Sequence, residues 1–254
     1  MSQQQAVGID VGGTGIKGAL VDIDTGELLS ERIKYPTPEG GHPGDIFEVI
    51  ARIASDCGPV ASGLPLGVCV PSVVKNGRTL TAANIATDWI GLEAEKTLEG
   101  RLGREIVFLN DADAAGVAEA HYGEAVGAPG LTILTTLGTG IGSALVQDGV
   151  LIANTELGHL EIDGEVAEHR SSAVARQRLG QDWQEWAAGL QRYYLHLNRL
   201  FSPNLFLLGG GVSKEADHFL HFISLPVPIR IAALRNNAGI LGAAFLAHTT
   251  RASR

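Results

Sequence analysis

The sequence contains two nearly identical glycine-rich segments, one near its start and one in its second half. Residues 13–21 read GTGIKGALV and residues 138–146 read GTGIGSALV, so that seven of nine positions coincide at an offset of 125 residues. Each segment follows an apolar run that we expect to form a strand, and each opens a hairpin. The repeat predicts two related α/β halves, each presenting a glycine-rich hairpin to a shared cleft. Chance similarity between two glycine-rich turns is the alternative.

The 254 residues suffice for one large domain or two smaller ones. Hydrophobic residues make up 45% and charged residues 19%, which favours a sizeable core over disorder. The two cysteines, Cys57 and Cys69, cannot build a disulfide framework or a cysteine-based zinc site. The sequence shows neither the pattern of a signal peptide nor an apolar run of the roughly 20 residues that span a bilayer. We therefore expect a cytoplasmic protein with no membrane partner.

The charge is unevenly distributed along the chain. The net charge of −9 argues against a nucleic-acid partner. Residues 170–254 nevertheless hold 10 Lys and Arg against 4 Asp and Glu, whereas residues 1–169 hold 9 against 24. Arginine presents a planar fork of donors that suits phosphate oxygens. The basic third of the chain therefore predicts a track for a polyanion, and random drift of surface charge is the alternative.

Apolar periodicity and turn residues predict strands that alternate with helices. The expected strands are 6–11, 16–23, 28–33, 66–70, 105–109, 131–137, a returning strand that ends at 146, 204–208 and 227–232. The expected helices are 44–56, 92–102, 110–122, 167–179, 182–200, 213–222 and 238–248. We expect residues 1–109 to form a small N-terminal lobe joined by the C-terminal helix 238–254, and residues 110–237 to form a large C-terminal lobe.

The first glycine-rich turn satisfies G-x-G-x-x-G over residues 13–18, which would favour a dinucleotide if a helix opened at the turn. The following residues instead alternate and turn again at 24–26, which predicts a hairpin, and the chain has no P-loop motif. We interpret the turn as a nest of backbone N–H groups for phosphate oxygens. Lys17 can meet a phosphate charge, and we expect Asp10 to hold a magnesium ion directly or through water.

A third glycine run, residues 209–211, ends a predicted strand before a predicted helix and forms a further platform for an anion. We expect the phosphoryl donor to be bound by residues from all three glycine runs. These residues are Asp10, Gly12, Gly13, Thr14, Gly15, Lys17, Gly138, Thr139, Gly140, Gly210, Gly211 and Lys214.

Asn110 and Asp111 stand where a predicted strand ends and a helix begins, the position at which α/β proteins place ligands. We expect the Asp111 carboxylate to accept a proton from a substrate hydroxyl, and Asp113 to cap the helix. Glu156 and His159 are three residues apart, and Glu168 follows. This set could hold a metal, but it lacks a third soft ligand and is better suited to sugar hydroxyls. The aromatic residues Trp183, Trp186, Tyr193 and Tyr194 favour core packing.

These motifs together resemble the ROK (repressor, open reading frame, kinase) family of sugar kinases. The resemblance rests on the turn that begins at Asp10, the Asn110–Asp111 pair, LGTGIG at 137–142 and ELGH at 156–159. Longer stretches, TAANIATDWIG at 81–91 among them, are similar to the subgroup that uses inorganic polyphosphate as phosphoryl donor. The resemblance covers about residues 6–248. It implies an actin-like, hexokinase-like (ribonuclease H-like) α/β fold with two lobes around a central cleft, and a homodimer.

The resemblance also implies roles for individual residues. Asp111 would be the base at the 6-hydroxyl of glucose, assisted by Mg²⁺. The implied sugar-binding residues are Asn84, Asn110, Asp111, Glu156, His159 and Glu168. Many members carry a cysteine-rich zinc motif where residues 161–176 contain no cysteine, so we expect no zinc. Ser72 stands where the family leads us to expect glycine, which bears on the preference for glucose or mannose.

The sequence therefore predicts transfer of a phosphoryl group to glucose from polyphosphate, with ATP as a second possible donor. Lys214, Arg192, Arg199 and Arg235 are candidates for guiding the polyphosphate chain. An ATP-dependent ROK hexokinase acting on mannose or another hexose is the alternative. A sugar-responsive transcription regulator would need a DNA-binding segment, which we do not expect because the first strand begins near residue 6. An actin-like filament protein is a further alternative, but the polar pairs at 110–111 and 156–159 would have no role in it.

Overall fold

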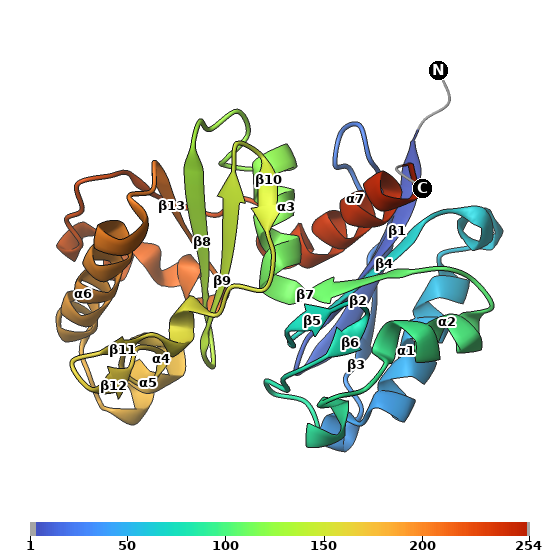
Figure 1. Cartoon of the computed structure of the whole chain (residues 1–254), viewed down its shortest axis with the longest axis horizontal. Coiled ribbons are helices and arrows are strands. Elements are labelled where there is room, and N and C mark those ends of the chain that lie inside the picture. The colour runs from blue at the N-terminus through green and yellow to red at the C-terminus, as the bar shows by residue number, and fades with distance from the viewer. Residues whose placement is uncertain (1–3, 253–254) are drawn as a thin grey trace. The chain divides into compact units, whose positions relative to one another are not determined.

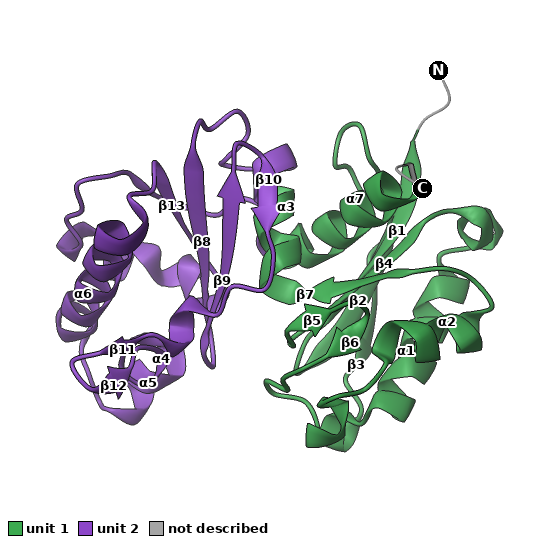
Figure 2. Ribbon diagram, in the orientation of Figure 1, with its two compact units in different colours: residues 1–118, 236–254 green, residues 119–235 purple. Residues whose placement is uncertain are grey.

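The computed structural model describes residues 4–252, and their contacts divide the chain into two compact units (Figures 1 and 2). Unit 1 comprises residues 1–118 and 236–254, and unit 2 comprises residues 119–235. The division falls within helix α3 (Asp111–Tyr122). No helix among residues 4–252 combines the length and apolar character needed to span a membrane.

Unit 1 is built on a five-stranded mixed sheet with the order β3-β2-β1-β4-β7. Its strands are β1 (Gln5–Val11), β2 (Gly15–Asp22), β3 (Ile33–Pro36), β4 (Leu66–Val70) and β7 (Val107–Asn110). β1 runs antiparallel to β2 and parallel to β4, which in turn is parallel to β7. The carboxyl ends of β1, β4 and β7 therefore share one edge of the sheet, and a short hairpin, β5 (Val74–Lys75) and β6 (Arg78–Thr79), follows β4.

Strand alternation gives the two faces of this sheet different partners. Val7, Ile9 and Val11 face α1 (Pro43–Asp56) and α2 (Ala94–Leu102) in one hydrophobic core. The other face receives α7 (Ala238–Ala252), and glycines make the approach close. A Cβ at Gly8 would lie 1.9 Å from the carbonyl oxygen of Ile240, and one at Gly67 1.9 Å from that of Ala243. Only glycine fits where backbone meets backbone at that distance.

Unit 2 repeats this arrangement with the order β10-β9-β8-β13-β14. Its strands are β8 (Leu131–Leu137), β9 (Ile141–Gln147), β10 (Val150–Ile152), β13 (Leu205–Gly209) and β14 (Ile229–Ile231). β8 pairs antiparallel with β9 and parallel with β13, as β1 does with β2 and β4. The mixed α/β fold class predicted from the sequence is confirmed, and the two repeated segments form equivalent hairpins.

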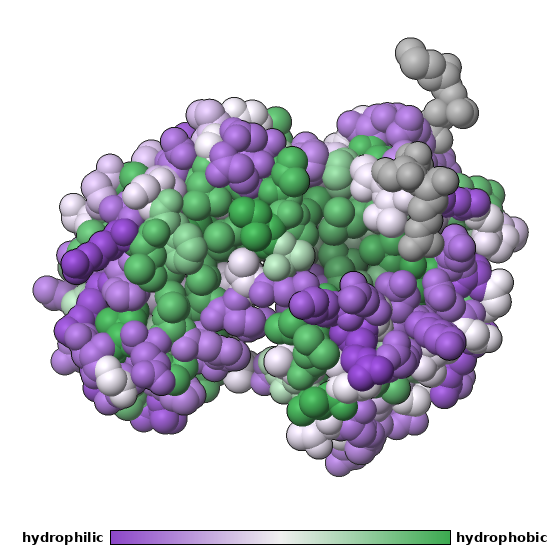
Figure 3. All heavy atoms as spheres, in the orientation of Figure 1, coloured by the Kyte–Doolittle hydropathy of each residue, from purple (hydrophilic) through white to green (hydrophobic). Residues whose placement is uncertain are grey.

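The core of unit 2 lies between this sheet and α6 (Trp183–Phe201). Trp186, Tyr193 and Tyr194 are at most 1% exposed, which confirms the core role predicted for them, and Trp183 packs at the margin of the same core. A hairpin, β11 (Glu161–Ile162) and β12 (Glu165–Val166), leads to α4 (Glu168–Ser171) and α5 (Ala173–Arg178). Apolar side chains also reach the surface at Val150 and Ile152 on β10, over which Figure 3 shows apolar atoms.

Three expected elements differ in the structure. The strand expected at 28–33 lies at 33–36, because the Ser30 hydroxyl accepts the backbone N–H of Leu20 and ordinary pairing begins only at Ile33. The helix expected at 167–179 is divided at Ser172, whose backbone is extended and whose Oγ caps α5. The helix expected at 213–222 consists of two 3₁₀ helices, 211–218 and 220–222. Asn76-Gly77 and Asp148-Gly149 turn their hairpins with positive φ.

Candidate active site

The first glycine-rich turn joins β1 to β2 and leaves its backbone open. Gly12 donates its N–H to the carbonyl oxygen of Gly15 at 3.1 Å, and the Thr37 hydroxyl donates to the carbonyl oxygen of Gly12 at 2.5 Å. Gly13 and Thr14 between them are exposed. A Cβ at Gly13 would lie 3.4 Å from the Cβ of Asn84, so a residue predicted for the sugar neighbours the turn predicted for the donor. Asn84 itself has a φ of 61°, in the left-handed region that asparagine tolerates.

Asp10 precedes this turn and is flanked on both sides of its strand. Lys17 is its partner on β2 and Cys69 its partner on β4. The Lys17 Nζ lies 3.4 Å from Asp10 Oδ2, and the Cys69 Sγ donates to Asp10 Oδ1 at 3.7 Å. The Asp10 side chain is 17% exposed. Burial raises the pKa of Asp10, and the Lys17 charge opposes that rise.

The surroundings of Asp10 fit a magnesium ion that is held mainly by water and substrate phosphates. One carboxylate at the turn is available, and no group of three or more His, Cys, Asp or Glu suited to a metal occurs among residues 4–252. Mg²⁺ commonly keeps several waters and binds through one or two carboxylates together with substrate phosphates. The chemistry of this donor set therefore suits an ion carried by the phosphoryl donor and fixed by Asp10.

Asn110 and Asp111 occupy the carboxyl end of β7 and the start of α3. Asn110 Oδ1 accepts the N–H groups of Ala112 and Asp113 at 2.8 and 3.0 Å. Asn110 therefore caps the helix, the role that the sequence interpretation gave to Asp113. Asp111 Oδ1 accepts the N–H of Ala112 at 2.9 Å, and its side chain is partly exposed. The cap and the strand end together hold the Asp111 carboxylate at the rim of the sheet.

Ser72 connects Asn110 with the loop that carries Asn84. The Asn110 Nδ2 donates to the carbonyl oxygen of Ser72 at 3.1 Å. The Ser72 Oγ donates to the carbonyl oxygen of Thr81 at 2.6 Å, and the Thr81 Oγ1 accepts the N–H of Val73 at 2.9 Å. Ser72 is 2% exposed. The Ser72 hydroxyl thus supports the geometry of the loop, whereas the sequence singled out Ser72 only as a departure from the glycine expected in the family.

In unit 2, the second glycine-rich turn lies against Glu168. Gly138 donates its N–H to the carbonyl oxygen of Gly140 at 3.0 Å, and Thr139 is exposed. Glu168 Oε2 accepts the N–H of Ile141 at 3.1 Å. A Cβ at Gly140 would lie 2.4 Å from this oxygen. Glycine at position 140 is what allows the carboxylate to reach the backbone of the turn.

The structure brings together the three residues that the sequence proposed for sugar hydroxyls in this unit. The His159 Nδ1 lies 3.9 Å from Glu156 Oε2, and its Nε2 lies 3.6 Å from Glu168 Oε1. Burial raises the pKa of Glu156, the His159 charge opposes this, and Glu168 adds to it. A Cβ at Gly158 would lie 2.3 Å from the carbonyl oxygen of Ile141, so this turn also packs directly on β9.

The third glycine run borders the second glycine-rich turn. Gly210 has a φ of 82°, and a Cβ there would lie 2.4 Å from the carbonyl oxygen of Leu137, one residue before the turn. Gly211 and Lys214 are exposed at the start of the 3₁₀ segment that follows. The remaining track candidates are exposed as well, and Arg192 forms an ion pair with Asp163.

Two α/β units with the same strand order, each carrying a glycine-rich hairpin after its first strand, define the actin-like and hexokinase-like class of fold. Within that class the chain belongs to the ROK family, whose pattern matches residues 6–176.

Individual relatives are similar over almost the whole chain. A polyphosphate glucokinase of Mycobacterium tuberculosis is 43% identical over 96% of this chain and 91% of its own length. The crystal structure of an inorganic polyphosphate/ATP-glucomannokinase from Arthrobacter sp. strain KM is 47% identical, with a TM-score of 0.91 over 97% of this chain and 99% of that one. A ROK family glucokinase from Streptomyces griseus, solved with glucose and AMPPNP, shares the fold at 24% identity and a TM-score of 0.80 over 96% of this chain and 99% of that one.

Proposed function

We propose that this protein transfers a phosphoryl group from inorganic polyphosphate to the 6-hydroxyl of glucose. The observation that carries the proposal is its identity of 43% and 47%, over nearly the full chain, to a polyphosphate glucokinase and a polyphosphate/ATP-glucomannokinase. ATP is a second donor in this proposal, because the latter protein is named for both. The same name includes mannose as a second sugar, which corresponds to the alternative drawn from the sequence.

Asp111 is the base in this proposal. Phosphoryl transfer needs mainly positioning and neutralisation of charge, with little covalent chemistry by the protein. The 6-hydroxyl oxygen forms a bond to the terminal phosphorus, its proton passes to the Asp111 carboxylate, and the bridging P–O bond breaks. The donor leaves shortened by one phosphate. The capped start of α3 supports this role, because it fixes the carboxylate on rigid backbone.

The other predicted residues divide between the two substrates. Glu156 and Glu168 each place a carboxylate oxygen within 3.9 Å of the His159 imidazole, and the three groups can accept from and donate to neighbouring sugar hydroxyls. Asn84 and Asn110 provide amides in unit 1. The open backbone of both glycine-rich turns, with Lys17, supplies donors and positive charge for phosphate oxygens.

Magnesium supplies neutralisation of the phosphate charge when it is bound. Asp10 would hold it directly or through water, and the Lys17 ammonium beside Asp10 adds positive charge at the same turn. We also propose that the protein is a cytoplasmic homodimer, an expectation that analytical ultracentrifugation tests for the oligomeric state.

The decisive experiment compares Asp111→Asn with the wild type. Loss of the base should lower kcat by about 100-fold or more and leave glucose affinity within about threefold. Asp88→Asn is the control, because Asp88 is an exposed acid of the same unit, bonded to His42, and should leave both quantities unchanged. Initial rates are measured with glucose and mannose against polyphosphate and ATP, in magnesium. A wild-type rate in Asp111→Asn would remove Asp111 from the chemistry, and a rate with ATP alone would replace polyphosphate as donor.

A further inference from the structure

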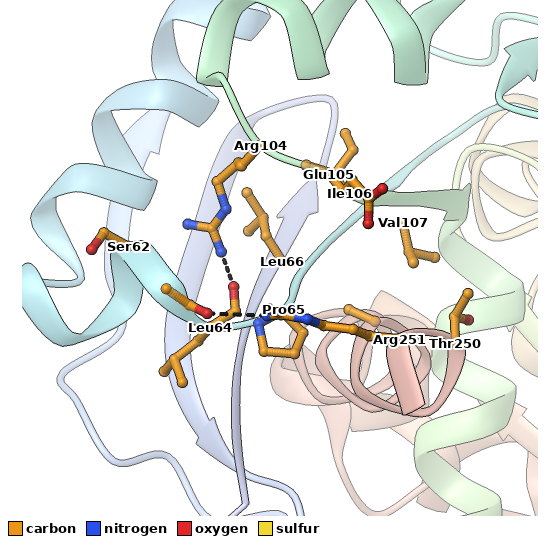
Figure 4. A pocket seen from close by; sticks show the side chains of 12 residues that line it. Ser62, Leu64, Pro65, Leu66, Arg104, Glu105, Ile106, Val107, Thr250 and Arg251 are labelled. Atoms are coloured by element: carbon orange, nitrogen blue, oxygen red, sulfur yellow. Dashed lines mark hydrogen bonds between the residues drawn. The ribbon is translucent and has the colours of Figure 1, made fainter. Parts of the chain in front are cut away.

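A cavity in unit 1 lies away from the residues assigned to catalysis. It has a volume of about 260 Å³ and opens at the amino ends of β4 and β7, beside the last turn of α7 (Figure 4). Asn110, by contrast, stands at the carboxyl end of β7. Cavities for drug-sized ligands span roughly 300–1,000 Å³, so this one suits a smaller molecule.

Two arginines border the cavity. Arg104 donates from Nη1 to the carbonyl oxygen of Ala61 at 3.0 Å and also to that of Leu64. Arg251 donates from Nη1 to the carbonyl oxygen of Gly63 at 3.0 Å. Figure 4 shows both guanidinium groups directed toward this short segment, Gly63–Leu64. Both guanidinium groups therefore lie at the same end of the cavity.

Neither arginine forms an ion pair with a carboxylate in the described part of the chain. Their hydrogen bonds go to neutral carbonyl oxygens. Burial and the charge of Arg251 lower the pKa of Arg104. Arg104 is half-buried and Arg251 is exposed, so the cost of a like charge close by falls mainly on Arg104. Each guanidinium keeps further N–H donors, since it has five in all.

The remaining walls are largely apolar. Pro65 and Val107 line the cavity and are half-buried, and Leu66, Ile106 and Ala247 lie behind them, at most 4% exposed. Glu105 also lines it, so that the formal charge of the lining is +1 from two arginines and one glutamate. A bare inorganic anion would leave the apolar wall uncovered, and an uncharged molecule would leave the net positive charge of the lining uncompensated.

We propose that this cavity binds a small organic monoanion, whose carboxylate contacts Arg251 and Arg104 and whose short apolar body covers Pro65 and Val107. The site is independent of the kinase activity proposed above. Its ligand should bind equally well in the presence of glucose and ATP, because the cavity lies at the opposite ends of the strands from Asn110 and the glycine-rich turn.

Calorimetric titration with three probes tests both parts of the proposal. Hexanoate carries the charge and the apolar body, acetate carries the charge alone, and 1-hexanol carries the body alone. We expect saturable binding of hexanoate with a dissociation constant in the millimolar range or below, and at least about tenfold weaker binding of the other two. Equal affinities for all three, or no saturable binding of hexanoate, would overturn the proposal.

A pair of variants locates the binding. Arg251→Gln removes the charge but keeps an amide donor for the Gly63 carbonyl oxygen, and it should weaken hexanoate binding by about tenfold or more, as expected for loss of a charged hydrogen bond. Arg52→Gln is the matched control, because Arg52 is exposed on α1, stacks on Tyr35 and should not matter. Unchanged affinity in Arg251→Gln, or displacement of hexanoate by ATP, would assign the binding elsewhere and refute the site. Failure of glucose phosphorylation would leave these titrations unaffected, so the two proposals fail separately.

Discussion

Gly140 offers a direct test of how the second glycine-rich turn holds Glu168. A methyl group at position 140 would lie 2.4 Å from Glu168 Oε2, whereas ordinary contact begins near 3.4 Å. In Gly140→Ala the carboxylate must therefore retreat by about 1 Å, and its hydrogen bond from the Ile141 N–H, now 3.1 Å, passes out of range. Since the atom that yields is the end of a flexible side chain, the protein can accommodate the methyl group without moving its backbone.

The magnitude follows from the bond that is lost. A hydrogen bond to a charged group contributes about 1.5–3 kcal/mol, which corresponds to a factor of roughly 10–150. We expect kcat/KM for glucose to fall by up to about this factor in Gly140→Ala, and the free energy of unfolding to fall by about 1.5–3 kcal/mol because the same bond stabilises the folded turn. Steady-state kinetics at saturating polyphosphate and urea denaturation measure the two quantities.

Gly138 provides the matched control within the same turn. A Cβ there would meet nothing within 4 Å, so Gly138→Ala adds the same methyl group without displacing Glu168. At saturating polyphosphate it should retain kcat/KM for glucose within about threefold, since an effect of this donor-binding residue falls on the KM for polyphosphate. Equal losses in the two variants would show that the turn itself, rather than the position of Glu168, controls glucose use, and the reasoning would fail.

Three further predictions concern pH, the sugar loop and salt. Burial raises the pKa of Glu156, so its contribution to stability is present at low pH and is lost as the pH rises through the raised pKa. The unfolding free energy of the wild type, relative to that of Glu156→Gln, should therefore increase as the pH falls from neutral toward about 4.5. A difference between the two proteins that stays constant with pH would contradict this. Ser72→Ala should lose about 1 kcal/mol of stability with the hydrogen bond to Thr81 and should change the ratio of glucose to mannose rates, measured with both sugars; an unchanged ratio would separate Ser72 from sugar choice. Polyphosphate-dependent rates should fall more steeply with salt than ATP-dependent rates if the basic third of the chain guides the longer anion, and equal slopes would argue against a track.

The sequence predicts most elements of the fold because their apolar periods are long and clear. The helix over 44–56 and the strands at 66–70 and 131–137 lie within one residue of their expected bounds. Short polar segments are harder. Residues 211–222 form 3₁₀ turns rather than an α-helix, since over two turns a period of 3.0 residues cannot be distinguished from one of 3.6.

The site residues could be predicted from the sequence, but the residues that lie beside them in the folded protein could not. Alternation along a strand shows which face a residue occupies but does not identify the residue beside it on the next strand. The pairing of Asp10 with Cys69 on β4 depends on a register set by the whole sheet. The capping of α3 by Asn110 depends in the same way on where β7 ends, which lies one residue beyond the expected bound.

In unit 1, the close packing of α7 against the sheet determines the surroundings of Asp10. Gly8 and Gly67 let α7 approach the sheet until backbone meets backbone, and this brings Gly239 against Asp10, where a Cβ would lie 2.8 Å from the carboxyl carbon. The Cys69 thiol then reaches both the Asp10 carboxylate and, at 3.5 Å, the Gly239 carbonyl oxygen. A larger residue at position 8 or 67 would separate helix from sheet and loosen Asp10. Glycines far from any substrate are thus required for the position of the acid beside the phosphate turn.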